Sequence, residues 1–393
     1  FIYILNKYRK YMHRISRQSG ETSIEQIELV EQPTAPVIFL SSASTDINAI
    51  SESLKLTINQ TLRGKITATL ISDLDHPAKI DHYLATTSSK AKIIIVRLLG
   101  GRSYWPYGLE KLIQWKEASS NRNLIILSGV SDNENEIQQL SSIKKDIVDH
   151  LAKLIRSGGI NNIKTFLLLV SDLLDNKAIL LKKYKLYHFP EIKKWDWEKE
   201  KGYKIGIILY NSLLKANDLK LANTINRIIR DKGMAPKLIW INSLRNKYIH
   251  AKIIRLFQEE NVDAILTATS FSSSKYIYGE PKCDIWDNLD VPVFQMLTST
   301  GSKNSWQLSS IGLNPIDLTL QIVMPEVDGI ITTRPCAFKE SSSINNSLNT
   351  AIKYLDPSES NINWVIDHAR NWIKLRHLKN KDKKITIILA NYP

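Results

Sequence analysis

The chain has 393 residues, of which 43% are hydrophobic and 8% are aromatic. This length exceeds that of one ordinary core and predicts two or three globular domains. The formal net charge is +14, but no Lys/Arg run alternates with aromatic residues as single-strand nucleic-acid binding requires, so we expect diffuse charge and no nucleic-acid partner.

The cysteine count and the hydropathy of the sequence exclude several classes of protein. The two cysteines, Cys283 and Cys336, exclude a disulfide framework and a four-cysteine zinc site. No apolar run approaches the roughly 20 residues of a membrane span. We therefore expect a soluble, cytoplasmic protein without a membrane span.

The N-terminal residues 1–33 are expected to form a leader or tail. The sequence starts at Phe1, and in residues 1–11 the apolar part precedes the positive part, which is the reverse of a secretory signal. Met12 is the expected start of translation. We interpret residues 1–11 as not native.

Residues 34–188 are predicted to form a first α/β domain. Strand patterns occupy residues 37–43, 65–73, 91–99 and 123–129, and helical patterns occupy 80–90, 107–118 and the helix-rich stretch 137–175. The strands are β-branched runs without polar alternation. Such runs between helices predict a parallel sheet that is covered on both faces.

A second α/β domain is predicted over residues 203–300, after a charged linker at 189–202. Its strand patterns lie at 203–210, 236–242, 263–269 and 291–299, and its helical patterns at 214–231 and 248–260. The predicted fold class is α/β, with successive doubly wound parallel-sheet domains of the Rossmann or flavodoxin type.

Residues 301–393 are expected to start a further mixed α/β domain that is incomplete. A strand-like apolar run at 320–324 comes first. An amphipathic helix follows, with one expected apolar face made of Ile362, Val365, Ile366, Ala369 and Trp372. Residues 385–393 are predicted to be a strand without a following partner, so we interpret the chain as C-terminally truncated.

Loops at strand ends are the expected ligand-binding places in open α/β sheets. Four of them are polar or contain glycine: 98–108, 127–136, 267–276 and 297–306. None has the spacing of a phosphate-binding loop, and G-x-x-x-x-G-K-[ST] is absent from the sequence. Any ATP chemistry is therefore expected in another chain.

Two carboxylates follow Pro325. If the segment is extended, Glu326 and Asp328 lie two residues apart and point to the same side, and Gly329 permits a turn. Two carboxylates facing a cleft suit proton removal or brief binding of a divalent cation. The alternative is that they cap a turn and pair with Arg334 or a lysine.

The histidines do not indicate a metal site. His76 and His82 are six residues apart, which is not one-face helical spacing, and Pro77 separates them. His368 and His377 lie nine apart on a basic helical pattern, so we expect them to be solvated.

Several segments in order resemble the large subunits of aerobic cobaltochelatase, the CobN family. They are "FLSSASTDI" (39–47), "DLDHPAKIDHY" (73–83), "KIIIVRLLGGRSYWPYGLE" (92–110), "GGINNIKTFL" (158–167), "DAILTATSFS" (263–272), "SWQLSSIGLNPIDLTLQIVMPEVDGI" (305–330) and "ILANYP" (388–393). The similar large H-type chain of magnesium chelatase shares the "MPEVDG" region. Ser270 and Ile330 depart from the glycine and arginine expected in the family.

This resemblance implies insertion of Co²⁺, as substrate, into hydrogenobyrinic acid a,c-diamide during cobalamin synthesis. It implies CobS- and CobT-like AAA+ ATPase subunits as partners, with ATP used by them and no cofactor bound by a recognisable motif here. The polycarboxylate corrin gives the positive charge a use. The family's His-Gly-Thr-His-like stretch lies beyond residue 393, so this fragment alone is expected to be inactive.

The expected roles combine the resemblance with the spacing. Glu326, supported by Asp328, is expected to accept pyrrole protons or to guide the metal. The expected substrate-binding residues are Gly100, Gly101, Arg102, Tyr104, Trp306 and Arg334, with the two arginines meeting acetate or propionate groups. The alternatives are a non-catalytic module that binds tetrapyrrole or docks the ATPase, and the H-type chain of magnesium chelatase in chlorophyll synthesis.

Overall fold

The computed structural model describes residues 27–55, 62–129, 134–244, 246–270, 272–273, 275–277, 280–282, 284–345 and 347–389. The expected start at Met12, Cys283 and residues 390–393 lie outside this part of the chain. The chain divides into two compact units. The first extends to Phe189 and also includes Lys215–Asp218 and Ser341–Tyr354, and the second contains Pro190–Leu214, Leu219–Glu340 and the residues from Leu355 onward.

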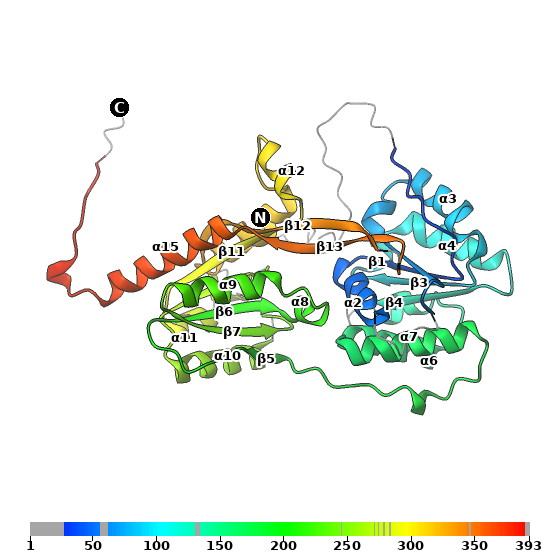
Figure 1. Ribbon diagram of the computed structural model, residues 1–393, viewed down its shortest axis with the longest axis horizontal. Coiled ribbons are helices and arrows are strands. Elements are labelled where there is room, and N and C mark those ends of the chain that lie inside the picture. Colours follow the sequence, from blue (N-terminus) through cyan, green and yellow to red (C-terminus); the bar gives the residue numbers. More distant parts are fainter. Residues whose placement is uncertain are drawn as a thin grey trace. The chain divides into compact units, whose positions relative to one another are not determined.

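The sheet of the first unit has four parallel strands in the order β2-β1-β3-β4 (Figure 1). The strands are β1 (Val37–Ser41), β2 (Ile66–Leu70), β3 (Ile93–Leu98) and β4 (Asn123–Ser128). In β3, Ile93 and Ile95 enter the core on one face, while Ile94 and Val96 enter the core on the other. Burial on both faces explains why these strands read as unbroken apolar runs.

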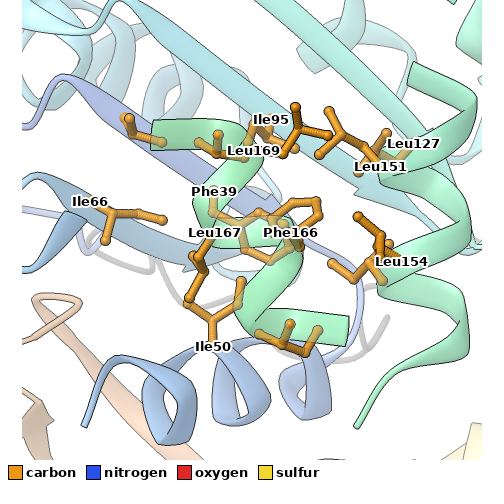
Figure 2. Packing of buried hydrophobic residues seen from close by; sticks show 14 of the residues in the cluster. Phe39, Ile50, Ile66, Ile95, Leu127, Leu151, Leu154, Phe166, Leu167 and Leu169 are labelled. Carbon is orange, nitrogen blue, oxygen red and sulfur yellow. The ribbon is translucent and has the colours of Figure 1, made fainter. Parts of the chain in front are cut away.

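Helices cover both faces of this sheet. On one face pack α2 (Ser44–Leu54), α6 (Lys145–Ser157) and α7 (Ile160–Leu174), where Phe39 of β1 meets Phe166 of α7 edge to face at 6.2 Å (Figure 2). On the other face pack α3 (Pro77–Ala85) and α4 (Pro106–Glu117). The shorter helical segments are η2 (Ile71–Leu74), η3 (Thr87–Lys90), η4 (Arg102–Tyr104), α5 (Glu134–Gln138) and η6 (Leu181–Lys183).

Residues far along the chain complete the first unit. Leu348 is fully buried in its core, and the carbonyl of Leu348 accepts a hydrogen bond from the backbone N–H of Ala68 at 3.1 Å. Asn349 donates to Thr67 Oγ1 at 3.0 Å, and Asn345 donates to Ser51 Oγ at 2.8 Å. The segment Ser341–Tyr354 is therefore an integral part of this unit.

The sheet of the second unit has seven strands in the order β13-β12-β11-β8-β6-β7-β5 (Figure 1). They are β5 (Ile192–Trp195), β6 (Lys204–Tyr210), β7 (Ala235–Ile241), β8 (Ala264–Thr267), β11 (Val293–Ser299), β12 (Ile331–Asn345) and β13 (Thr350–Pro357). Strands β7, β6, β8, β11 and β12 are parallel, whereas β5 runs antiparallel to β7. The predicted α/β class with parallel sheets is confirmed.

Helices also cover both faces of the second sheet. The apolar sides of α9 (Lys220–Asp231) and α15 (Glu359–His377) share one core, and those of α10 (Lys247–Glu260) and α11 (Asp284–Leu289) share the other. The remaining elements are α8 (Asn211–Lys215), β9 (Lys275–Ile277), β10 (Glu280–Lys282), α12 (Lys303–Leu308), α13 (Pro315–Leu318), η7 (Thr319–Val323), α14 (Met324–Val327) and η8 (Asn380–Asp382).

The structure differs from the expected elements in three places besides residues 320–324, which are helical. Residues 192–195, expected in a linker, form edge strand β5, where Trp195 meets Trp240 edge to face at 6.0 Å. Residues 301–340, expected to start a further domain, join the second unit and extend its sheet through β12. Residues 385–389, expected to be a strand, have no strand pairing and are highly exposed.

Candidate functional site

The predicted glycine loop of the first unit lies at the carboxyl end of β3, beside the end of β1. These two strands are the neighbours between which the strand order β2-β1-β3-β4 changes direction. Ligands in open α/β sheets bind at such switch points. The backbone N–H of Ser42 donates to the carbonyl of Arg97 at 3.0 Å, so the loop after β1 is hydrogen-bonded to the end of β3.

Gly100 and Tyr104 are packed together in this loop. A Cβ atom on Gly100 would lie 3.0 Å from Cβ and 3.1 Å from Cδ2 of Tyr104, so a larger residue would displace the ring. Burial raises the pKa of Tyr104, and a hydrogen bond with the side chain of Ser42 partly opposes that shift. Arg102 is exposed on η4, next to Gly101. The four predicted residues therefore lie in one loop, where Gly100 and Tyr104 are packed together.

A buried charged cluster lies under this loop, and sequence reasoning missed it. Arg97 of β3 pairs with Asp46 in the first turn of α2, and Ser41 Oγ donates to the same carboxylate at 2.5 Å. Within the described part of the chain, Nε of Arg97 has no hydrogen-bond partner. The signal in the sequence is a single arginine in an otherwise apolar strand, because a buried charge needs a partner.

The acidic segment of the second unit is helical, so the expectation of an extended conformation was wrong. Residues 315–327 run through α13, the π-helix η7 and α14, and Glu326 lies in the last of these. Two sequence signals favour this helix: Pro315 is in its first turn, and Asn314 caps it by accepting from the N–H of Asp317. Pro325, which lacks an N–H group, lies in the first turn of α14, where no intrahelical donor is needed.

The two carboxylates consequently have different surroundings. Asp328 is buried and accepts from Ser272 Oγ, from Ser273 N at 2.6 Å and from Ser273 Oγ at 2.7 Å. Glu326 is exposed and accepts from Thr332 Oγ1 at 2.7 Å. Asp328 thus fastens the loop after β8, while Glu326 presents a carboxylate to solvent. Gly329 makes the expected turn, with φ of 74°.

Two buried polar residues hold this helical segment to the end of β11. Asp317 accepts from Thr300 N at 2.8 Å and from Asn314 Nδ2 at 2.9 Å. Gln321 accepts from Thr298 N at 2.6 Å and donates to Thr298 O at 2.5 Å. Neither residue was predicted, because their importance depends on long-range contacts with β11.

Arg334 lies on β12, with its Cζ atom 4.2 Å from the ring centroid of Trp364 on α15. The ring of His368 stacks on Trp364 at 4.9 Å, and Trp372 Nε1 donates to His368 Nε2 at 3.2 Å. His368 is therefore half-buried between two indoles, contrary to the expectation of a solvated histidine.

Three further side chains of the second unit, Trp306, Trp372 and Cys336, differ in how deeply they are buried. Trp306 of α12 packs against Phe338 at 5.3 Å, so its ring is partly committed to the protein interior. Trp372 was expected on the apolar face of α15 but is 44% exposed. The neighbouring Ile373 is buried in the core instead. Burial raises the pKa of the Cys336 thiol, which makes it unreactive.

The described residues contain no group of three or more His, Cys, Asp or Glu side chains arranged to hold a metal ion. In the same part of the chain, every helix is too short or too polar to cross a membrane. Within the second unit, Glu326 is held by Thr332 of β12, and Arg334 follows two residues later on the same strand, after the register with β11 has shifted. The second unit therefore exposes a carboxylate at Glu326 and, separately, a guanidinium group with an aromatic ring beneath it at Arg334.

Comparison with known proteins gives consistent results. The chain is 27% identical to the aerobic cobaltochelatase subunit CobN of Sinorhizobium sp over 97% of its length, and 24% identical to that of Pseudomonas aeruginosa over 97%. It spans 31% of the length of each relative. The H-type chain of magnesium chelatase from Rhodobacter capsulatus is 24% identical over 48% of the chain and 17% of that protein.

A solved structure has the same fold. The catalytic subunit of cobaltochelatase from Mycobacterium tuberculosis matches with a TM-score of 0.59 and 20% identity, over 90% of this chain and 28% of that one. The family model CobN/Magnesium Chelatase matches residues 152–393, which is more than half of the chain. The chain therefore belongs to the CobN/magnesium chelatase family.

Proposed function

We propose that the chain is part of the large, tetrapyrrole-binding subunit of an ATP-dependent cobaltochelatase, which inserts Co²⁺ into hydrogenobyrinic acid a,c-diamide in cobalamin biosynthesis. Two relatives that align with 97% of the chain are cobaltochelatase subunits. The structural observation that carries the proposal is that the second unit exposes two groups with the required chemistry, the carboxylate of Glu326, which Thr332 of β12 holds, and the guanidinium group of Arg334, which Trp364 supports.

The chemistry of metal insertion requires a proton acceptor. When a divalent cation binds in the macrocycle, the inner nitrogens lose protons, and a carboxylate within hydrogen-bond reach can accept them. Glu326 has this role in the proposal, since its carboxylate is exposed and only one of its oxygens accepts from Thr332. Asp328 supports it by holding the loop after β8.

The other predicted residues bind the corrin in this proposal. Arg102 in the first unit and Arg334 in the second unit each offer a planar guanidinium group, which forms paired hydrogen bonds with a carboxylate. Gly100, Gly101 and Tyr104 line the strand-end loop of the first unit, and Trp306 supplies apolar surface in the second. Co²⁺ enters as a substrate, and CobS- and CobT-like AAA+ partners hydrolyse the ATP.

The test is the Glu326→Gln substitution in the full-length protein within the assembled chelatase. We expect the rate of Co²⁺ insertion to fall about 10²-fold or more, because proton transfer by a positioned group contributes about 10²–10⁴-fold. The matched control is Glu259→Gln, which changes an exposed carboxylate of α10 that pairs with Arg255. Equal insertion rates in the two variants would remove Glu326 from the mechanism.

The similarity to the H-type chain of magnesium chelatase supports a second candidate, insertion of Mg²⁺ into a porphyrin. Assays of the assembled complex with each metal and macrocycle separate the two enzymes. A non-catalytic module is a third candidate. It would quench tryptophan fluorescence with the corrin, or retain the ATPase subunits in a pull-down, while Glu326→Gln left insertion unchanged.

A further inference from the structure

Arg334 differs from other arginines of the second unit in its partners. Arg227, Arg230 and Arg255 each donate to a carboxylate at 2.6–2.7 Å. Arg334 is exposed, and among the residues that the structure describes no carboxylate lies within ion-pair distance of it. Its guanidinium group instead lies over the indole of Trp364, 4.2 Å from the ring centroid.

The backbone around Arg334 is irregular and is tied to the helix that carries Trp364. The register between β11 and β12 shifts after the Gln295–Thr332 pair, and Leu297 next pairs with Pro335, so Arg334 lies at an irregularity of the strand. Such bulges redirect a side chain. Helix α15 is tied to the same place, because Asn361 Nδ2 donates to Pro335 O at 2.8 Å.

The far side of Trp364 is also supported. His368 stacks on Trp364 with an interplanar angle of 10°, and Trp372 Nε1 donates to His368 Nε2. These three residues recur every four positions on α15 and so share one side of the helix. His368 and Trp372 both contact the fully buried ring of Phe294, edge to face, at 5.6 and 5.9 Å. The stack is thereby anchored to the core.

This arrangement suits one kind of ligand. A guanidinium group that lies over a ring is supported by it, and its N–H donors can still bind both oxygens of a carboxylate. Ordering of the side chain before binding reduces the entropy lost on binding. An exposed arginine without a carboxylate partner, on a prebuilt aromatic support, is therefore a binding group for an external carboxylate.

We propose that Arg334 is a clamp for a carboxylate group of the ligand, with Trp364 and His368 as positioning residues that act through it. The identification of that ligand as a macrocycle depends on the proposed function, whereas the recognition of a carboxylate does not.

The test compares three probes on the full 393-residue chain: uroporphyrin, which is a macrocycle with carboxylates; tricarballylate, which has carboxylates alone; and inorganic phosphate. The variants are Arg334→Lys, Trp364→Leu and the double variant, with Arg255→Lys as the matched control on an exposed, paired arginine. Circular dichroism verifies that each variant folds. Affinity is measured by absorption titration for uroporphyrin and by calorimetry for the other two.

We expect Arg334→Lys to weaken uroporphyrin and tricarballylate about tenfold or more, because lysine keeps the charge and loses the paired geometry. Trp364→Leu should weaken both probes, and the double variant should bind no more weakly than Arg334→Lys alone, since Trp364 acts through the arginine. Arg255→Lys should bind like the unmodified chain. Phosphate should bind more weakly than tricarballylate.

Three results would overturn the clamp: affinities of Arg334→Lys within twofold of the unmodified chain, additive losses in the double variant, or no binding of either carboxylate probe. Failure of the proposed function has a different signature. In that case tricarballylate still binds in an Arg334-dependent way, but uroporphyrin binds no more tightly than tricarballylate.

Discussion

Lys215 shows how a single residue can carry a cost in stability. Its side chain packs over Gly158 in the first unit, and its ammonium group lies 4.8 Å from the ring centroid of Phe189. Burial, and then the charge of Arg97, lower the pKa of Lys215 from its usual 10.5 to about 8. Two cations kept partly out of water disfavour the charged lysine in the folded state.

The pH dependence follows from this pKa. Between about pH 8 and 10.5 the unfolded chain keeps the proton that the folded chain has lost, so stability rises with pH through this window. Lys215→Met should therefore raise the free energy of unfolding at pH 7, because it removes the cost of burying the charged lysine. We expect a gain on the order of 1–2 kcal/mol, which is less than the pKa shift alone would give, since the side chain is partly exposed to water. The gain should be much smaller at pH 10 and should disappear above about pH 10.5.

Urea unfolding of the chain at pH 7 and pH 10 measures this difference. Lys145→Met is the control, since Lys145 is exposed and pairs with Asp149 on α6. A loss of stability in Lys215→Met at pH 7, or an effect that is the same at both pH values, would contradict the assignment.

At the scale of elements, the tip of the β12–β13 hairpin belongs to the core of the first unit. Leu348 is fully buried there, whereas Ile344 of the same hairpin is 69% exposed. Leu348→Ala should lower the stability of the first unit by about 2–5 kcal/mol, the usual cost of removing a buried leucine side chain. Ile344→Ala should change it by less than about 0.5 kcal/mol.

Amide hydrogen exchange measures this loss of stability at individual residues of the first unit. The amide of Ala68 donates to Leu348 O, so its protection should fall in Leu348→Ala and remain in Ile344→Ala. Similar protection of Ala68 in both variants would show that the tip contributes little to this unit.

The central strands could be predicted from the sequence because local pattern and burial agree in them. Residues 93–96 and 205–209 are continuous apolar runs within the predicted strands at 91–99 and 203–210, and both runs are buried in strands that are covered on two faces. The run at 320–324 has a similar composition but forms a helix, because contacts of Asp317 and Gln321 with β11 and the cap at Asn314 decide its conformation. Composition alone does not contain those contacts.

The candidate site was predictable in part for the same reason. Strand-end position indicated Gly100 and Tyr104, which are in contact. The prediction that Glu326 and Asp328 point to the same side assumed an extended backbone. The segment is helical, so Glu326 is exposed and Asp328 is buried. The support of Arg334 by Trp364 joins residues 30 positions apart, and no local pattern in the sequence indicates it.

At the scale of the whole molecule, the positive net charge of the chain is opposite to the negative charge of the proposed corrin ligand. The net charge of +14 favours association with a polycarboxylate, and salt weakens such attraction. The chain spans 31% of the length of its CobN relatives, so insertion is tested in the complete complex and corrin binding in this chain.

The most direct test of the proposed function is an absorption titration of the chain with hydrogenobyrinic acid a,c-diamide at low and high salt. The proposal predicts a saturable spectral change with one corrin per chain, weaker at high salt and weaker again in Arg334→Lys. A corrin spectrum that stays unchanged at both salt concentrations would contradict the assignment of this chain as a tetrapyrrole-binding part of a chelatase.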